Sequence, residues 1–219
     1  MKTLFILLLT CSVAALAETT IDVLIENDRV RVRKVTVSPD HSTGFHVHEI
    51  NRVMLYLDEG RQSTISQDGP TTVQKWAAGE PLWSPATGMH RVELTAPGQV
   101  SMIQIELRRE GPSQASALGD LHPLKVDPEH YQLEFENDQV RVIRVKFPAG
   151  ADVPLHEHRS PRIVTYLTDA DLNAWDESGA LSRHAGQAGD VSWGDDVVRH
   201  HEKNLSNEAF EAVVVELKQ

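Results

Sequence analysis

The chain has 219 residues, which is enough for one large domain or two small ones. It carries 32 acidic side chains against 21 Lys and Arg, a formal net charge of −11. This balance argues against binding to nucleic acid or docking on an anionic membrane, because both need clustered basic groups. The 40% of hydrophobic and 24% of charged residues are typical of a folded chain, and the 11 histidines invite a functional interpretation.

Residues 1–17 are predicted to be a cleavable signal peptide. A lysine follows Met1, an apolar run covers residues 4–9, and Ala15-Leu16-Ala17 forms a small-x-small cleavage site. The apolar run is too short for a membrane span of about 20 residues. A buried N-terminal helix is one alternative, and lipidation at Cys11 is another. Cleavage after Ala17 leaves a chain without cysteine, as expected for a periplasmic or secreted protein without disulfides.

Short β-strands are predicted along the rest of the chain. Alternating β-branched and aliphatic residues occur at 30–37, 53–57 and 100–105, and again at 140–145, 163–167 and 210–215. Turn-forming sequences such as Ser38-Pro39-Asp40 and Ala96-Pro97-Gly98 separate these runs. The pattern predicts an all-β protein of two small β-barrel domains in tandem, residues 18–110 and 131–219, joined by a polar linker at 111–130.

The second half of the chain repeats the first half at an offset of 110 residues. Residues 26–32 recur at 136–142, and 19 of the 82 positions between 26 and 107 are identical without a gap. The identities include three histidines in each copy. The sequence therefore indicates a duplicated domain.

The six repeated histidines are the candidate metal ligands. Histidines two residues apart on a strand lie on one face, and a third from a distant strand can complete a site for a divalent metal ion. The alternative is that they are core or surface residues with ordinary hydrogen bonds. Five further histidines have no partner at the offset and are predicted to lie at the surface or rim. The candidate ligands are His46, His48, His90, His156, His158 and His200, and the other five are His41, His122, His130, His184 and His201.

In the spacing of these histidines the chain resembles a double-domain protein of the cupin superfamily. The first cupin motif opens with Gly, five residues and His-x-His, as in the stretch from Gly150 to His158. The second motif places Pro six residues and His eleven residues after a Gly, as at Gly79, Pro85 and His90. The resemblance implies two cupin, jelly-roll-like barrels, each with a divalent metal ion held by the histidines at 46, 48 and 90 or at 156, 158 and 200.

The chain departs from the cupin pattern at the acidic ligand. Cupins usually complete the site with a Glu from the first motif, and this chain has Val53 and Ile163 where that residue is expected. The residue before each is an arginine, Arg52 or Arg162. An inward arginine could hold a carboxylate or enolate that binds the metal, whereas an outward one would form a surface ion pair. Strand alternation through Leu55 predicts that residue 53 points toward the metal.

The segments before the third histidine differ between the two copies. Asp195 and Asp196 precede His200, whereas the matching segment before His90 is neutral. One of these carboxylates could supply an acid or base that the first barrel lacks. The alternative is a solvated turn, which Asp favours.

Three functions remain open at this stage. The first is a metal-dependent enzyme, an oxidoreductase of the dioxygenase kind or an isomerase, acting on a small anionic or oxygen-rich molecule. The second is a non-catalytic protein that binds a metal or small ligand, and the third is a structural module with vestigial sites. Imidazole ligands suit Fe, Mn, Zn, Cu and Ni, so the metal is not identified. The expected partner is a small molecule. The chain is expected to have no membrane span and to be a monomer or a homodimer.

Overall fold

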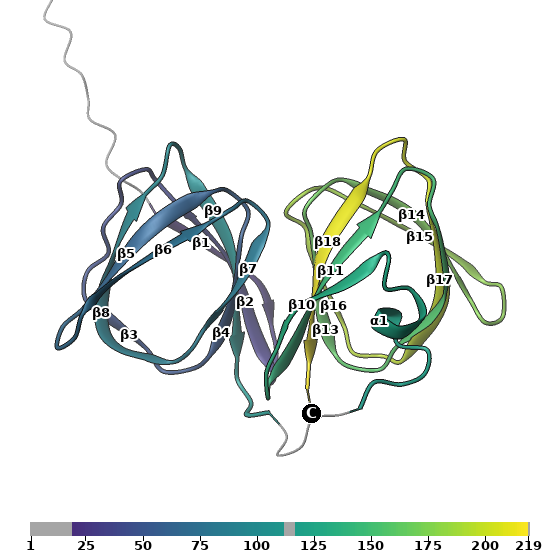
Figure 1. Ribbon diagram of the computed structural model, residues 1–219, viewed down its shortest axis with the longest axis horizontal. Coiled ribbons are helices and arrows are strands. Elements are labelled where there is room, and N and C mark those ends of the chain that lie inside the picture. Colours follow the sequence, from purple (N-terminus) through teal and green to yellow (C-terminus); the bar gives the residue numbers. More distant parts are fainter. Residues whose placement is uncertain (1–18, 112–116, 219) are drawn as a thin grey trace, which may run out of the picture.

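The computed structural model describes residues 19–111 and 117–218, so the predicted signal peptide lies outside the described residues. These residues form two β-barrels that lie side by side (Figure 1), with one short helix, α1(Pro123–Val126), before the second barrel. The prediction of an all-β protein with two tandem barrels is confirmed. No helix among the described residues is long and apolar enough to cross a membrane.

The N-terminal barrel consists of two antiparallel sheets. The five-stranded sheet has the order β1-β2-β9-β4-β7 and the four-stranded sheet the order β3-β8-β5-β6. The strands are β1(Thr19–Glu26), β2(Val30–Val37), β3(His46–His48), β4(Arg52–Tyr56), β5(Gly60–Ser66), β6(Thr71–Trp76), β7(Glu80–Ser84), β8(Thr87–Thr95) and β9(Val100–Leu107).

The C-terminal barrel repeats this arrangement strand for strand. Its sheets have the orders β10-β11-β18-β13-β16 and β12-β17-β14-β15, so each pairing of the first barrel has its counterpart in the second. The strands are β10(Tyr131–Glu136), β11(Val140–Phe147), β12(Asp152–His158), β13(Arg162–Tyr166), β14(Ala170–Asp176), β15(Leu181–Gly186), β16(Val191–Gly194), β17(Val198–Asn204) and β18(Phe210–Leu217). The duplication in sequence is therefore a duplication of topology.

A hydrophobic core joins the two barrels. It is formed by alternate residues of the central strands of both five-stranded sheets, and its members come from β2, β4 and β9 on one side and β11, β13 and β18 on the other. Trp83 and Trp193 pack against its edge. The two sheets thus pack through their outer faces, while their inner faces line the barrel interiors (Figure 1). The fully buried members of this core are Val30, Val32, Val53, Leu55, Ile103, Ile105, Val140, Val142, Ile163 and Val213.

The chain between the barrels packs against the C-terminal barrel before it enters β10. The His122 side chain accepts a hydrogen bond from the Leu124 N–H and so caps α1, and Pro123 occupies the first turn, where its missing N–H is not needed. The Glu157 N–H donates to the Leu121 carbonyl at 2.8 Å, which joins this segment to β12. His122 is only 7% exposed, so its prediction as a surface residue is wrong.

Candidate metal centres

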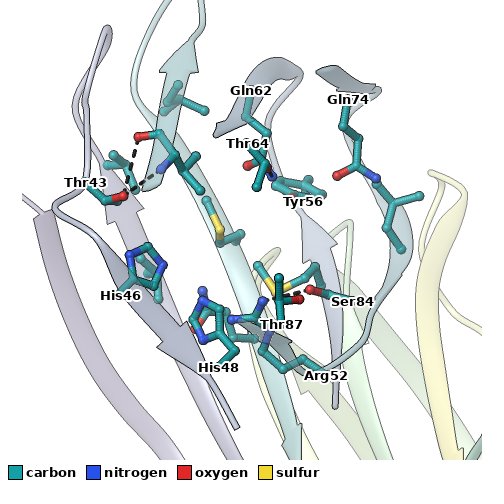
Figure 2. Close-up of a pocket in the computed structure, with 18 of the residues that line it drawn as sticks. Thr43, His46, His48, Arg52, Tyr56, Gln62, Thr64, Gln74, Ser84 and Thr87 are labelled. Atoms are coloured by element: carbon teal, nitrogen blue, oxygen red, sulfur yellow. Dashed lines mark hydrogen bonds between the residues drawn. The ribbon is translucent and has the colours of Figure 1, made fainter. Parts of the chain in front are cut away.

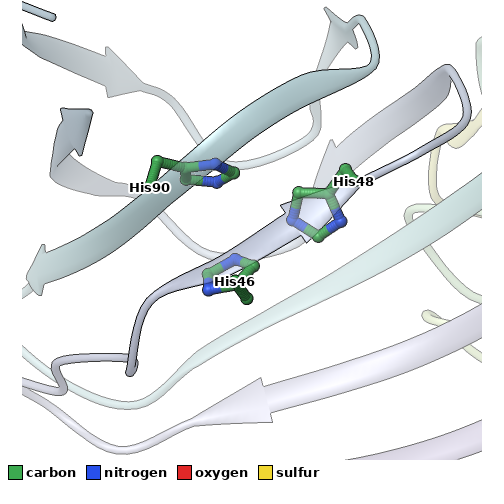
Figure 3. A group of neighbouring side chains, drawn as sticks. All are labelled: His46, His48 and His90. Atoms are coloured by element: carbon green, nitrogen blue, oxygen red, sulfur yellow. The ribbon is translucent and has the colours of Figure 1, made fainter. Parts of the chain in front are cut away.

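Three histidines meet inside the N-terminal barrel. His46 and His48 alternate along β3, and His90 lies opposite His46 in the antiparallel pair of β3 with β8. One nitrogen from each ring lies within 4.8 Å of the others (Figure 3). Three imidazole nitrogens this close together can ligate one divalent ion.

The C-terminal barrel contains the same arrangement in His156, His158 and His200. Their ring centroids lie 4.9, 4.5 and 5.4 Å apart, against 4.8, 4.5 and 5.3 Å for the corresponding pairs in the first barrel. Thus all six candidate ligands from the sequence fall into two matching groups of three.

Backbone carbonyls orient the rings. The Nδ1–H of His46 donates to the Gly44 carbonyl at 2.8 Å, His90 donates to the Gly88 carbonyl at 2.7 Å, and His156 to the Pro154 carbonyl at 2.9 Å. Because a carbonyl only accepts, these bonds place the proton on Nδ1 and leave the Nε2 lone pair free for a metal. In addition, the buried Nε2 of His200 has no hydrogen-bond partner within the described chain. The donor set therefore fits a divalent ion.

Burial favours the neutral imidazole at His48, His156 and His200. It lowers the pKa of His48 to about 3, with a further contribution from the charge of Arg52. It also lowers the pKa of His156 to about 3 and that of His200 to about 2, in both cases with repulsion from neighbouring histidines. A neutral imidazole is the form that ligates a metal, so binding at neutral pH requires no deprotonation of these groups.

The arginines, and not the residues after them, point into the barrels. Val53 and Ile163 are fully buried in the core between the barrels, so the prediction that residue 53 faces the metal is wrong. Both faces of β4 are buried, and alternation therefore brings Arg52 to the interior together with Met54 and Tyr56. Arg162 lines the interior of the second barrel in the same way.

Neither inward arginine is neutralised by an ion pair within the described residues. One Arg52 nitrogen donates to Ser84 Oγ at 2.8 Å, while its buried Nε has no partner there. Arg162 donates to the backbone carbonyl of Asp196 at 3.2 Å. Burial lowers the pKa of Arg52 to about 10 and also lowers that of Arg162, yet both stay charged at neutral pH. Each candidate metal site thus has a charged arginine beside it, and this arginine has hydrogen-bond donors without a protein partner.

The triads and arginines line cavities of different size. The N-terminal cavity has a volume of about 480 Å³ and the C-terminal one about 290 Å³. Figure 2 shows the first cavity with His46, His48 and Arg52 at one end and Gln62, Thr64 and Gln74 at the other. Both volumes are those of small-molecule sites or slightly smaller.

The second barrel contains a carboxylate that sequence reasoning missed. The Tyr131 hydroxyl donates to Glu202 Oε2 at 3.2 Å and lies 3.1 Å from His156 Nε2, and the same Glu202 oxygen is 3.7 Å from that nitrogen. Burial raises the pKa of Glu202 to about 7. Asp195 and Asp196, considered for this role from the sequence, are exposed. Alternation from His200 along β17 was the available signal, because it places residue 202 on the face of the ligand.

A second buried carboxylate, Glu216, lies close to His158 of the second triad. It accepts hydrogen bonds from His122 Nε2 at 3.1 Å and from Arg141 at 3.0 Å, and His158 Nδ1 lies 4.0 Å away. Burial alone would raise the pKa of Glu216, but these donors hold it well below its usual range. In the first barrel the corresponding Glu106 keeps the pair with Arg31, the counterpart of Arg141, and pairs with Arg33 in place of the histidine. The His158 Nδ1 has no hydrogen-bond partner within the described chain, so Glu216 acts on this ring through its nearby negative charge.

The comparisons with known proteins agree with this architecture. No protein-family model matches the sequence, and no curated protein matches it significantly. Among solved structures, AerE from Microcystis aeruginosa has a TM-score of 0.68 at 15% identity, over 92% of this chain and 93% of AerE. A cupin 2 conserved barrel domain protein from Leptotrichia buccalis has a TM-score of 0.56 at 11% identity, over 94% and 91%.

A third similar structure is a mutant of the oxalate decarboxylase from Bacillus subtilis, with a TM-score of 0.62 at 11% identity, over 92% of this chain and 73% of the mutant enzyme. Identities this low compare folds and not activities. The fold of the chain is therefore that of two cupin barrels in tandem, and each barrel carries its histidine triad on the strands expected from the cupin motifs.

Proposed function

We propose that each barrel binds a divalent metal ion through its three histidines, together with a small carboxylate or enolate held between the metal and the inward arginine. The observation that carries this proposal is the position of Arg52 and Arg162, which point into the barrels beside the triads without a carboxylate partner in the described chain.

The charge balance supports an anionic ligand. Three neutral imidazoles leave a divalent ion with its full formal charge, and the nearby guanidinium adds a further positive charge. Three protein ligands also leave positions open for an outside ligand. An arginine can hold one carboxylate through two hydrogen bonds, which fixes the orientation of the anion. Oxalate decarboxylase, one of the proteins with a similar fold, is named for a small dicarboxylate.

On this proposal the second barrel carries the chemistry. Glu202 is the one acidic side chain that lines either cavity within the described residues, and with Tyr131 it lies next to a metal-ligating nitrogen. A buried carboxyl in this position could transfer a proton to or from a bound anion. Of the reaction classes expected from the sequence, this geometry favours an isomerase over an oxidoreductase.

A non-catalytic role is the second candidate, and the first barrel favours it. Its cavity is lined by histidines, arginines, amides, hydroxyls and apolar side chains, without an acidic group. A site of this composition can bind an anion, and its one imidazole outside the triad, that of His41, contacts Thr19 Oγ1 at 3.2 Å. The first barrel would then serve as a binding module within the same chain.

Metal content and anion affinity together test the proposed function. Protein purified without chelator and loaded with Mn, Fe, Zn or Cu should contain two divalent ions per chain by elemental analysis, and His90→Ala or His200→Ala should each remove one. Calorimetric titration of the loaded protein with acetate should show binding that Arg52→Leu and Arg162→Leu each weaken at one site without changing metal content.

The exposed Arg61 on β5 provides a matched control, and Arg61→Leu should leave acetate binding unchanged. Chains that load no metal would contradict the first part of the proposal. If the metal-loaded Arg52→Leu and Arg162→Leu variants both bind acetate with the affinity of the wild type, the second part is contradicted.

We also propose that the chain is exported to the periplasm or secreted. The support is the signal-like sequence of residues 1–17 and the absence of cysteine from residue 18 onward. The purified protein from the native cells should begin at Glu18 by N-terminal sequencing. An N-terminus at Met1 in the cytoplasmic fraction would contradict export.

A further inference from the structure

We infer that the N-terminal barrel accepts a larger organic anion than the C-terminal barrel, and that this larger ligand is a monocarboxylate whose far end carries an uncharged hydroxyl or amide group. The inference rests on the proposed function, because the carboxylate end is assigned to the metal and Arg52. It adds which of the two barrels takes the larger ligand and what the rest of that ligand must be.

The far wall of the N-terminal cavity offers unused hydrogen-bonding groups. Gln62 on β5 makes only one long contact, at 3.5 Å to Thr64 Oγ1, and the Gln74 side chain has no hydrogen bond within the described chain. Both amides extend from the four-stranded sheet toward the space above Tyr56 (Figure 2). An amide offers hydrogen-bond donors and an acceptor. This wall therefore suits a ligand group that can both donate and accept a hydrogen bond, such as a hydroxyl or an amide.

The lack of free charge at this wall excludes a second carboxylate on the ligand. A dicarboxylate would need a cation there, and Arg33, the arginine of the lining other than Arg52, already donates to Glu106 and to the side-chain oxygen Oε1 of Gln104. Aliphatic side chains make up much of the remaining lining. The cavity therefore fits a molecule with one charged end, a hydrocarbon middle and a neutral polar end. The aliphatic lining residues include Val35, Met54, Leu82, Leu94 and Met102.

The C-terminal barrel serves as an internal comparison, since it has the same strands with a different lining. Leu172 and Ala174 occupy the positions of Gln62 and Thr64. Aromatic rings fill the interior as well, because Phe147 and Phe210 replace the smaller valines of the first copy. With the smaller volume of about 290 Å³, this barrel lacks both the room and the amide wall for the same ligand.

Three six-carbon probes test the inference: hexanoate, 6-hydroxyhexanoate and adipate, each titrated calorimetrically into the zinc-loaded protein. They share one carboxylate and differ only at the far end. We expect 6-hydroxyhexanoate to bind about fivefold more tightly than hexanoate, the gain typical of one added hydrogen bond, and adipate to bind no better than hexanoate. Arg52→Leu should remove binding of all three, and Arg162→Leu should leave it unchanged.

The wall itself is tested with Gln62→Leu, which installs the residue of the second barrel at this position. This variant should lose the preference for 6-hydroxyhexanoate and keep hexanoate binding. Gln74→Leu, at an exposed position, should reduce the preference and serves if Gln62→Leu does not fold. Leu172→Ala in the other barrel is the matched control and should change nothing.

The possible failures are distinguishable. Equal binding of the three probes, tightest binding of adipate, or loss of binding in Arg162→Leu instead of Arg52→Leu would overturn the inference and leave the proposed function intact. A zinc-loaded protein that binds neither acetate nor any of the three probes would overturn the proposed function as well.

Discussion

Arg52 and Val53 show how one position along a strand decides between two roles. The arginine faces the metal ligands and the valine faces the other barrel, although both are buried and adjacent. Sequence alone could not assign these faces, because a strand buried on both sides loses the alternation of polar and apolar residues on which such assignments depend.

Replacing each of these residues by Glu should therefore have opposite effects. Arg52→Glu places a carboxylate beside three neutral imidazoles, so the N-terminal site should bind metal at least tenfold more tightly and lose its affinity for acetate. Val53→Glu buries an unpaired charge between the barrels and should cost several kcal/mol of stability. Metal competition titrations and urea unfolding measure the two outcomes. Tighter metal binding in a folded Val53→Glu variant would contradict the assigned faces.

Glu202 should make the stability of the metal-free protein depend on pH. Its pKa is about 7 in the folded chain against an ordinary 4.5, because burial disfavours the charged form. The folded state therefore holds this proton more tightly, so the contribution of Glu202 to the free energy of unfolding is largest below pH 4.5 and is lost as the pH rises through 7. The decrease should be about 3 kcal/mol, from the free-energy equivalent of a pKa difference.

Glu202→Gln stays neutral and should lack this decrease. Urea unfolding of both proteins between pH 4.5 and 8 gives the comparison, with Glu208→Gln at the exposed turn after β17 as a control. A constant difference in unfolding free energy between the wild type and Glu202→Gln across this range would show that Glu202 does not titrate there.

At the scale of elements, the histidine pairs were predictable and their supports were not. The His-x-His spacing and its repetition indicated which strands meet, and the structure brings the six histidines together in two groups. The contacts of Glu202 with Tyr131, and of His122 with Glu216, join residues 71 and 94 positions apart. No local pattern encodes such pairs, because they arise only when the sheets close into a barrel.

The segment that contains α1 should control the second metal site. His122→Ala removes both the helix cap and the hydrogen bond to Glu216, which lies beneath His158. We expect the metal affinity of the C-terminal site to fall about tenfold or more, the usual effect of losing a group that orients a ligand, while the N-terminal site is unchanged.

His130→Ala is the matched control, because His130 follows the same helix and pairs with Asp127 away from the triad. It should lower stability without changing metal affinity. Equal loss of affinity in the two variants would indicate a general loosening of the segment, and the role assigned to His122 would be wrong.

At the scale of the whole molecule, the shared core makes the barrels one folding unit. Residues from both copies are fully buried in it, so an isolated barrel would expose a sheet face made of valine, leucine and isoleucine. The sequence predicted two domains in tandem, whereas the common core between the outer faces of their five-stranded sheets is seen only in the structure.

Metal bound in one barrel should therefore stabilise both. In the His200→Ala variant, zinc can occupy only the N-terminal triad, yet calorimetry should show a single unfolding transition that shifts to higher temperature for the whole chain. The His90→Ala variant provides the reciprocal measurement. Two separate transitions, with only one shifted by zinc, would mean that the barrels unfold independently.

The shared core also has a consequence for how the two halves have diverged. Its positions keep aliphatic residues in both copies, as at Val32 and Val142 or Leu107 and Leu217. Interior positions on the four-stranded sheets differ between the copies, with Gln62 against Leu172 and Val92 against Glu202. The outer faces of the five-stranded sheets thus preserve the pairing of the halves, while the interior of each barrel is open to change. After duplication, one copy could acquire a new ligand preference by mutation while the partner supplied an unaltered surface to fold against.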